Sequence, residues 1–338
     1  MAAGRERAGS GRSVPEPPAG ERPGRAGAAR PTVALTGATG FIGSAVRAAL
    51  DARGVRVRAL ARTVPDERGA TDWVPGDLAD GAALTALCEG ADVLLHLASR
   101  VSGGTEECEA VNVRGTAAVT AAAGRAGVHR IVHLSTAAVY GVGPHDGVEV
   151  DGVVPAPHSE ASRTRLLAER HALAAGAVVL RPGLVTGTGD RWVVPALAEL
   201  VRRVPGRWEG GRARLSLVDR EDLARLITVL ALDDHAVPSG VHHASHPEPV
   251  RAGDLLDALA GLGLLPAADG PDTSWEECRR LLAAAPGRVS ERQFALIARD
   301  HWYRSEDVWR LAACPPGPGP LAGLAAAVPW YRRALARV

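Results

Sequence analysis

Three glycines near the start of the chain have the spacing of a nucleotide-binding turn. They lie in the stretch TGATGFIG, which runs from Thr36 to Gly43. In such a stretch the first glycine permits a tight turn, the second lets the backbone approach a pyrophosphate, and the third allows close helix packing. The helix that follows offers free N–H groups and a positive dipole end to the same pyrophosphate. The stretch therefore predicts dinucleotide binding through Gly37, Thr39, Gly40, Phe41, Ile42 and Gly43.

The residues after the next predicted strand indicate which dinucleotide is bound. An acidic residue at this point would bind the ribose hydroxyls of NAD, and none is present. Arg62 stands there instead, and its planar guanidinium suits the 2′-phosphate of NADP. The alternative is that Arg62 is an ordinary surface arginine. The missing carboxylate favours NADPH as the cofactor, with NADH possible.

A second candidate contact to the cofactor is the pair Asp77-Leu78. The carboxylate of Asp77 stands where it could accept a hydrogen bond from the adenine amine. The alternative is that Asp77 caps the helix expected from Ala82, and both roles can hold together.

Short apolar strands alternate with helices from Pro31 to about Gly183. The expected strands are Thr32–Thr36, Val55–Ala61, Thr71–Val74, Asp92–Ala98, Arg130–Ser135 and Ala177–Arg181; the expected helices are Phe41–Arg53, Ala82–Cys88, about Glu106–Ala126 and about Ser162–Ala175. This alternation predicts a Rossmann-type, doubly wound parallel sheet of the α/β class. Beyond Gly183 the periodicity is irregular, and a smaller, mostly helical C-terminal substrate-binding region is expected.

The chain of 338 residues is long enough for one large domain or two. We expect a dinucleotide-binding domain made of residues 31–185 and about 215–245. Residues of about 186–214 and 246–338 would form the substrate-binding region. Residues 1–30 are rich in Gly, Pro, Ala and Arg and predict a disordered tail.

The composition excludes several classes of partner. The net charge of +1 gives no reason to expect binding to nucleic acid or to an anionic membrane. The stretch from Leu311 to Trp330 is uncharged, but Pro315, Pro316, Pro318 and Pro320 exclude a membrane-spanning helix. The four cysteines have no metal-ligand spacing and suit a reducing, cytoplasmic compartment. We expect no metal, and a monomer or a homodimer.

All 39 basic residues counted as Lys or Arg are arginines, so the chain contains no lysine. Schiff-base chemistry needs a lysine amine, and a standard P-loop needs a lysine for its phosphates. Both mechanisms are therefore excluded. A reductase that relies on a Tyr-x-x-x-Lys pair is excluded for the same reason.

Motifs in a fixed order give the chain a resemblance to the extended short-chain dehydrogenases/reductases of the epimerase/dehydratase type. The matching segments are Thr36–Gly43, Gly76–Leu78, Asp92–Ala98, Asn112–Thr116, Leu134–Gly141, Leu180–Gly183 and Leu217–Ala224. The resemblance covers about Pro31 to Leu262. It implies that the cofactor is also lined by Leu97, Ala98, Ser99 and Val101 after the fourth strand, and by Pro182, Gly183 and Leu184 in the nicotinamide loop.

The resemblance also implies a catalytic Ser or Thr, a Tyr and a Lys. Thr136 occupies the hydroxyl position, with a purely structural hydroxyl as the alternative. The tyrosine position is Ala161 and the lysine position is Arg165, so both of those catalytic residues are absent. An alanine cannot donate a proton, and an arginine stays charged and is a poor donor. Thr136, Ser99, a water or a phenol of the substrate beside its ketone would have to stabilise the forming alkoxide.

Three functions remain open on this basis. The first is an NADPH-dependent ketoreductase that reduces a carbonyl of a polycyclic aromatic polyketide, because the chain looks most like the family members that act on angucyclinones. The second is a catalytically inert NADP-binding sensor. A nucleotide-sugar epimerase or dehydratase fits less well, since Ala137 and Ala138 replace the acidic pair of the dehydratases.

Several other polar residues have two interpretations each. Asn112 would bridge a helix and a strand or act in a proton relay, and Tyr140 would pack or hold the cofactor side of its loop. His145 stands with His158 in a Pro/Gly-rich segment that would border the substrate, or both are solvated loop histidines. The pair His242-His243 lacks partners that would indicate a metal site.

Overall fold

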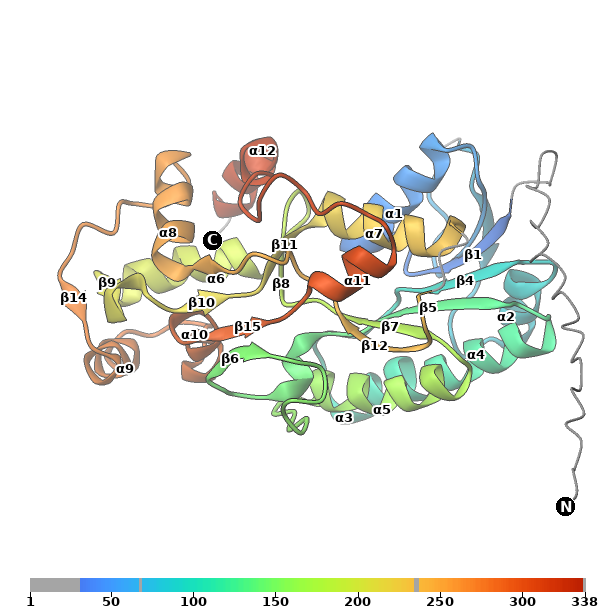
Figure 1. Ribbon diagram of the computed structural model, residues 1–338, viewed down its shortest axis with the longest axis horizontal. Coiled ribbons are helices and arrows are strands. Elements are labelled where there is room, and N and C mark those ends of the chain that lie inside the picture. The colour runs from blue at the N-terminus through green and yellow to red at the C-terminus, as the bar shows by residue number, and fades with distance from the viewer. Residues whose placement is uncertain (1–30, 67–68, 234–236, 337–338) are drawn as a thin grey trace, which may run out of the picture. The chain divides into compact units, whose positions relative to one another are not determined.

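Seven parallel strands form the central sheet, in the order β12-β7-β5-β4-β1-β2-β3 (Figure 1). The computed structural model describes residues 31–66, 69–233 and 237–336, so the tail predicted for residues 1–30 lies outside the described residues. The strands are β1 Thr32–Thr36, β2 Arg56–Ala61, β3 Asp72–Pro75, β4 Val93–His96, β5 Arg130–Leu134, β7 Val178–Arg181 and β12 Gly240–His243. Strand order reverses at β1, and ligands of such sheets bind at the carboxyl ends beside that reversal.

Helices cover both faces of this sheet (Figure 1). One face carries α1 (Phe41–Ala52) and α7 (Arg220–Leu232), and the other carries α2 (Gly81–Cys88), α4 (Gly115–Arg125) and α5 (Glu160–Ala174). Alternate residues of each strand enter the two cores: Val33 and Leu35 pack with α1 and α7, whereas Ala34 packs with α2 and α4. This architecture confirms the predicted Rossmann-type fold. The sequence allowed the prediction because strands that are buried on both faces are continuous apolar runs.

The helix predicted over about 106–126 is confirmed, but it contains a π-helical stretch that the sequence did not show. The segment consists of α3 (Thr105–Cys108), a π-helical segment Glu109–Arg114 and α4. Such wide turns occur mostly as insertions in helices, frequently at functional sites. Asn112 is the buried residue of this segment.

The remainder of the chain adds further helices and three small sheets. The helices are α6 Val193–Arg203, α8 Ala252–Gly261, α9 Trp275–Ala284, α10 Glu291–Ala298, α11 Glu306–Leu311 and α12 Leu324–Leu335. The strands are β6 His145–Val148, β8 Leu184–Thr186, β9 Arg207–Trp208, β10 Arg214–Leu215, β11 Leu217–Asp219, β13 Val250–Arg251, β14 Asp272–Thr273 and β15 His301–Tyr303. These strands have two to four residues, too few to show an alternation of apolar and polar residues. The sequence therefore predicted only the helices of this region.

Residues 31–338 group into one compact unit. Within it, α6, α8, α9, α10 and α12 enclose a core of their own around Trp208, Phe294 and Tyr331. Segment 217–243 returns to the central sheet through α7 and β12. The division into a dinucleotide-binding and a substrate-binding part stays a prediction.

The structure also describes the cysteines and the longer helices, which the sequence analysis discussed. All four cysteines are buried and unpaired. Among the described residues, no helix has the length and apolar character needed to cross a membrane. In the same part of the chain, no group of three or more His, Cys, Asp or Glu residues could hold a metal ion.

Candidate functional site

The glycine turn between β1 and α1 is tightly packed. Gly37 has a φ of +75°, and a Cβ added there would lie 2.6 Å from the backbone nitrogen of Ala98. A Cβ on Gly43 would lie 2.0 Å from the carbonyl oxygen of Gly37. The turn therefore excludes any side chain at Gly37 or Gly43, and the end of β1 lies directly against the end of β4.

The N-terminus of α1 has the character of an anion site. Its first flanking residue, Gly40, makes no side-chain cap, and the first turn contains no acidic residue. Thr39 and Gly40 are exposed, and Phe41 and Ile42 are half-buried. Uncapped N–H groups at a helix N-terminus bind phosphate groups. These residues fit the pyrophosphate of a dinucleotide.

A buried hydrogen-bond chain supports this turn from behind. The hydroxyl of Thr36 lies 2.7 Å from Nδ1 of His96, and Nε2 of His96 lies 2.9 Å from the hydroxyl of Thr116. The N–H of Leu97 donates to the Thr36 carbonyl at 3.2 Å, and the N–H of Ala98 donates to the Thr36 hydroxyl at 3.3 Å. Burial lowers the pKa of His96 to about 4, so this imidazole is neutral at pH 7. The predicted contacts Leu97 and Ala98 thus lie beside Gly37.

On the adenine side, Arg62 is exposed directly after β2. It forms no ion pair with any other residue that the structure describes, unlike Arg58 of the same strand, which binds Asp72. A guanidinium without an internal carboxylate partner remains available for a phosphate.

The interpretation of Asp77 as a helix cap is wrong. Asp80 caps α2, because its Oδ1 accepts from the N–H groups of Ala82 and Ala83, each at 3.0 Å. Asp77 is exposed, and among the residues that the structure describes its side chain accepts only from the N–H of Ala79, at 2.8 Å. One of its oxygens therefore remains free for the adenine amine. Leu78 beside it is buried.

Thr136 lies where the end of β5 meets the predicted nicotinamide loop. It is half-buried, and its Oγ1 accepts from the N–H of Ala138 at 3.2 Å at the start of a 3-10 turn, Ala137–Tyr140. The N–H of Ala137 donates to the carbonyl of Pro182 at 2.8 Å. This bond brings the loop that contains Gly183 and Leu184 next to Thr136, although the two segments are far apart in the sequence.

Helix α5 presents Ala161 and Arg165 to the same strand end. Ala161 is half-buried in the first turn. Nη2 of Arg165 donates to the carbonyls of Leu134 at 3.0 Å and Ser135 at 2.6 Å. Its Nε is enclosed and has no partner among the residues that are described. Burial lowers the pKa of Arg165 to about 10, so a positive charge persists at pH 7 beside Thr136.

Asn112 ties the loop after β4 to α5. Its Oδ1 accepts from the N–H of Arg100 at 2.7 Å, and its Nδ2 donates to the Arg100 carbonyl and to the hydroxyl of Thr164, each at 2.9 Å. These bonds support the bridging interpretation of Asn112. Ser99 is half-buried and Val101 is exposed in the same loop.

Tyr140 belongs to a buried network that the sequence did not reveal. Its hydroxyl accepts from Nη1 of Arg181 at 2.7 Å and lies 2.7 Å from Nε2 of His243. Nδ1 of His243 donates to the carbonyl of Arg304 at 3.0 Å, which leaves Nε2 as an acceptor for Tyr140. Arg181 in turn binds Glu169 of α5. Burial raises the pKa of Tyr140, so this tyrosine holds the loop and does not replace the missing proton donor.

Two charged residues within otherwise apolar segments were the features of the sequence that could have indicated this network. Arg181 ends a fully buried strand, and Glu169 lies on the buried side of α5. A charge in such a position requires a partner, but the sequence does not tell which partner it has.

The histidines of the Pro/Gly-rich segment differ from each other. His158 is exposed, as a solvated loop histidine would be. For His145 that interpretation is wrong, because it is buried in β6, where its ring contacts Tyr140, His301 and Tyr303. Pairing of β6 with β15, which the sequence did not show, removes it from solvent.

Arg220 is a further candidate that the sequence analysis missed. Its guanidinium carbon lies 5.8 Å from the ring centre of Phe41, the first residue of α1. Its Nη1 donates to the carbonyl of Thr188. A Cβ on Gly189 would lie 3.0 Å from the Phe41 ring. The segment after the nicotinamide loop thus meets the pyrophosphate turn, with a positive charge between them.

Helix α12 fixes that segment from the other side. The hydroxyl of Tyr331 accepts from the N–H of Gly187 at 2.9 Å and donates to Oδ2 of Asp190 at 3.1 Å. Nε1 of Trp330 donates to the carbonyl of Asp190 at 3.1 Å. The C-terminal Trp-Tyr pair therefore positions the residues that follow the nicotinamide loop.

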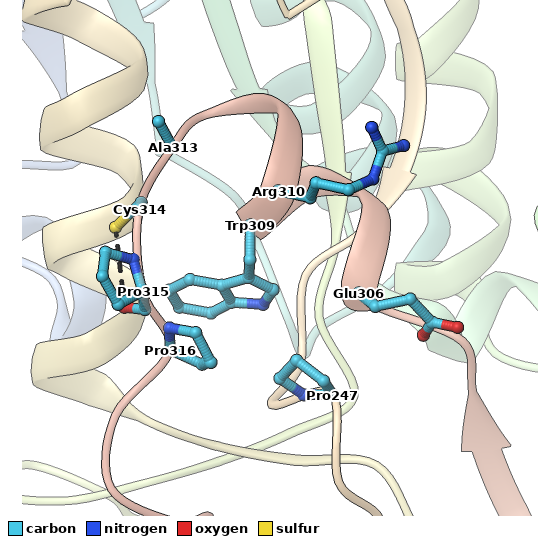
Figure 2. Close-up of a pocket in the computed structure, with 8 residues that line it drawn as sticks. All are labelled: Pro247, Glu306, Trp309, Arg310, Ala313, Cys314, Pro315 and Pro316. Carbon is cyan, nitrogen blue, oxygen red and sulfur yellow. Dashed lines mark hydrogen bonds between the residues drawn. The ribbon is translucent and has the colours of Figure 1, made fainter.

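A cavity of about 390 Å³ lies apart from these residues, beside α11 and the loop after it (Figure 2). Figure 2 shows Trp309 with Pro247, Pro315 and Pro316 around it. The cavity contains no predicted site residue, and burial raises the pKa of the adjacent Cys314 thiol, which makes it a poor nucleophile. We assign no catalytic role to this cavity.

Known proteins resemble the chain over most of its length. A sequence model of the NAD dependent epimerase/dehydratase family matches residues 33–242. A 2-alkyl-3-oxoalkanoate reductase of Stenotrophomonas maltophilia is 29% identical over 312 residues, which cover 82% of this chain and 92% of the relative. A 4-hydroxy-2-methyl-3-oxo-4-farnesyl-3,4-dihydroquinoline-1-oxide ketoreductase of Stigmatella aurantiaca is 33% identical over 194 residues, 53% of this chain and 58% of the relative. The crystal structure of a short-chain dehydrogenase/reductase superfamily protein from Agrobacterium tumefaciens with bound NAD superimposes with a TM-score of 0.70 at 25% identity, covering 90% of this chain and 98% of that one.

Proposed function

The chain belongs to the NAD dependent epimerase/dehydratase family and is thus an NAD(P)-dependent oxidoreductase acting on hydroxyl or carbonyl groups; we propose that it is an NADPH-dependent ketoreductase. Its substrate is a polycyclic aromatic polyketide ketone, of the type found in the angucyclinone of the antibiotic simocyclinone. The observation that carries the proposal is the composition of the site: Thr136 and the charged Arg165 meet at the end of β5, while Ala161 stands at the tyrosine position.

The cofactor-binding residues would hold NADPH along the carboxyl ends of the strands. The N–H groups of Phe41 and Ile42 would bind the pyrophosphate, with Gly37, Gly40 and Gly43 letting the backbone approach it. Arg62 would bind the 2′-phosphate, Asp77 the adenine, and the segments with Ser99, Val101 and Pro182 would border the nicotinamide. When bound, NADPH supplies the hydride that reduces the ketone to an alcohol.

Thr136 and Arg165 stabilise the negative charge that develops on the ketone oxygen. The Thr136 hydroxyl accepts from the N–H of Ala138, so its proton is free to be donated to the substrate oxygen. The Arg165 guanidinium stays charged because its pKa, although lowered by burial, is about 10. Fixed donors aimed at developing charge are usually the largest contribution to such catalysis. Proximity of the bound reactants contributes much of the rest.

The proton comes from the substrate. Ala161 has no proton to give, the Arg165 guanidinium is held by the carbonyls of Leu134 and Ser135, and the Tyr140 hydroxyl is bound within its own network. A phenol beside the ketone hydrogen-bonds the forming alkoxide within the same molecule and regains its proton from solvent. The two relatives named as reductase and ketoreductase support carbonyl reduction as the reaction class.

An inert NADP-binding sensor is the second candidate, favoured by the replacement of both catalytic residues at Ala161 and Arg165. Retention of Thr136 beside the nicotinamide loop favours the reductase. An epimerase or dehydratase fits less well, because oxidation of a sugar hydroxyl needs the missing tyrosine as base.

The decisive experiment follows NADPH consumption by the purified protein. The substrates are polycyclic aromatic ketones with and without a neighbouring phenol, with a control lacking any ketone, and products are identified by mass. Turnover confined to phenol-flanked ketones is the expected result. Tight NADPH binding without turnover of any ketone would replace the ketoreductase by the sensor.

A further inference from the structure

Four large hydrophobic side chains are exposed in the part of the chain that the structure describes. Their exposed fractions are 40% for Val64, 49% for Val101, 84% for Val154 and 58% for Trp192. Each one lies in a connection that leaves the carboxyl end of a central strand: β2, β4, β5 and β7 respectively. Ligands of doubly wound sheets bind at this edge, so each of these side chains belongs to a connection that starts on the side where ligand is expected.

Two of the four are adjacent to residues that would bind the cofactor. Val64 follows Arg62 by two residues, and Val101 follows Ser99 by two residues. Val154 and Trp192 have no such neighbour, and Trp192 is the aromatic residue among the four. An exposed tryptophan leaves apolar area in water at a free-energy cost, which a bound aromatic ligand would remove.

The backbone of Trp192 is firmly held although its ring is exposed. Its N–H donates to Oδ1 of Asp190 at 2.7 Å. Asp190 is buried and also accepts from the N–H groups of Val193 and Val194 at the start of α6, and from the Tyr331 hydroxyl. A fixed backbone limits the positions that the ring can reach, so less freedom has to be lost when a ligand binds.

Trp192 is also connected to the reacting end of the site. The segment that ends at Trp192 begins at Pro182, whose carbonyl accepts from the N–H of Ala137 next to Thr136. In its middle, Gly189 lies against Phe41 at the pyrophosphate turn. One short segment therefore joins the hydroxyl that would contact the ketone, the cofactor turn and the exposed indole.

We propose that Trp192 determines substrate specificity by stacking its indole on the planar ring system of the ketone, an inference that rests on the proposed ketoreductase function. Stacked aromatic pairs gain free energy beyond the area they bury. Trp192 follows the nicotinamide loop and precedes α6, so it contacts the part of the substrate remote from the reduced carbonyl. Binding at such a remote point sets KM rather than kcat when it is equal in ground and transition states.

The test compares W192A and W192F with the wild type on a tetracyclic phenol-flanked ketone. In W192A we expect KM to rise roughly five- to tenfold with kcat changed by less than about twofold, and in W192F a smaller rise. The NADPH dissociation constant stays unchanged in both. W302F is the matched control, because Trp302 lies in β15 with its Nε1 bonded to Asp146; its KM stays at the wild-type value.

Direct binding separates this inference from the proposed function. The same ketone, titrated into the NADP-bound protein, quenches tryptophan fluorescence in the wild type and in W302F but much less in W192F. An unchanged KM in W192A, or equal quenching in W192F and the wild type, would overturn the role of Trp192 while the ketoreductase function stands. No turnover by the wild type would overturn the function, and the quenching experiment would still decide whether Trp192 contacts an aromatic ligand.

Discussion

Arg181 and Glu169 form a buried bidentate ion pair directly behind the strand end that bears Thr136. Nε of Arg181 donates to Oε1 of Glu169 at 2.9 Å, and Nη2 donates to Oε2 at 2.5 Å. Only 5% of Arg181 and 2% of Glu169 are exposed. The hydroxyl of Ser135 also donates to Glu169, and Arg181 donates to Tyr140. The pair thus ties β7, α5 and both ends of the Thr136 loop together.

Breaking this pair is expected to destabilise the fold strongly. Removing one partner of a buried ion pair leaves an uncompensated charge, at a cost of about 3–5 kcal/mol. R181A should lose about that much free energy of unfolding, measured by urea denaturation. R279A is the control, because Arg279 and Glu291 form an exposed pair worth at most ~1 kcal/mol. Equal losses in the two variants would show that the buried pair contributes nothing special.

The close approach at the glycine turn predicts the effect of a single methyl group. In G43A the added Cβ would lie 2.0 Å from the Gly37 carbonyl oxygen. Helix α1 must therefore shift away from the glycine turn. We expect NADPH binding, followed by calorimetry, to weaken by about tenfold or more. In G124A, the added Cβ meets nothing within 4 Å in helix α4, and this variant should bind NADPH normally. Wild-type affinity in G43A would contradict the assignment of the pyrophosphate site.

Arg62 is expected to set the preference for NADPH over NADH. A charge-assisted hydrogen bond is worth about 1.5–3 kcal/mol, so R62A should raise the NADPH dissociation constant roughly tenfold or more. The NADH constant should hardly change, since NADH lacks the 2′-phosphate. R56A is the control, because Arg56 is also exposed but is paired with Asp72 of the neighbouring strand β3. A parallel loss of both cofactors in R62A would reject this role.

Removal of the Thr136 hydroxyl is expected to lower kcat. Loss of one hydrogen-bond donor to a developing oxyanion costs about 10²–10³ in kcat in well-studied cases. T136A is therefore expected to lower kcat at least tenfold while NADPH still binds, and T136S should retain most of the rate. If T136A keeps wild-type kcat with a reducible ketone, the hydroxyl is structural and the substrate phenol with Arg165 suffices.

Buried histidines make the fold sensitive to acid. Burial lowers the pKa of His96 and of His243 from 6.5 to about 4, so both are neutral in the fold and become protonated more readily in the unfolded chain. Their contribution to stability is complete above about pH 6.5 and is lost as the pH falls towards 4. The slope is up to ~1.4 kcal/mol per pH unit for each residue.

Urea denaturation at a series of pH values measures this effect. H243Q keeps a neutral acceptor for Tyr140, and its stability should fall less steeply between pH 6.5 and 4 than that of the wild type. H129Q, which changes an exposed histidine, should retain the wild-type slope. Identical slopes for H243Q and the wild type would show that folding does not lower the pKa of His243.

The sequence by itself determined the nucleotide-binding half of the molecule. Strands such as Thr32–Thr36 and Ala177–Arg181 were predicted to within a residue or two, because strands buried on both faces are short apolar runs between helical patterns. The glycine turn was also evident, because a φ of +75° at Gly37 and the contact at Gly43 permit no other residue. The absence of lysine needed no structure at all.

Only the tertiary structure decided which distant residues meet. No local sequence pattern predicts three of the contacts described above, because the partners are distant in the sequence and meet only when the elements pack. These contacts are Arg181 with Glu169, Tyr140 with His243, and Arg220 with Phe41. The same reason explains the misread His145, because its strand β6 pairs with the distant strand β15. A local pattern records which face of an element is apolar, whereas the partner of a buried polar group is fixed by how the elements pack.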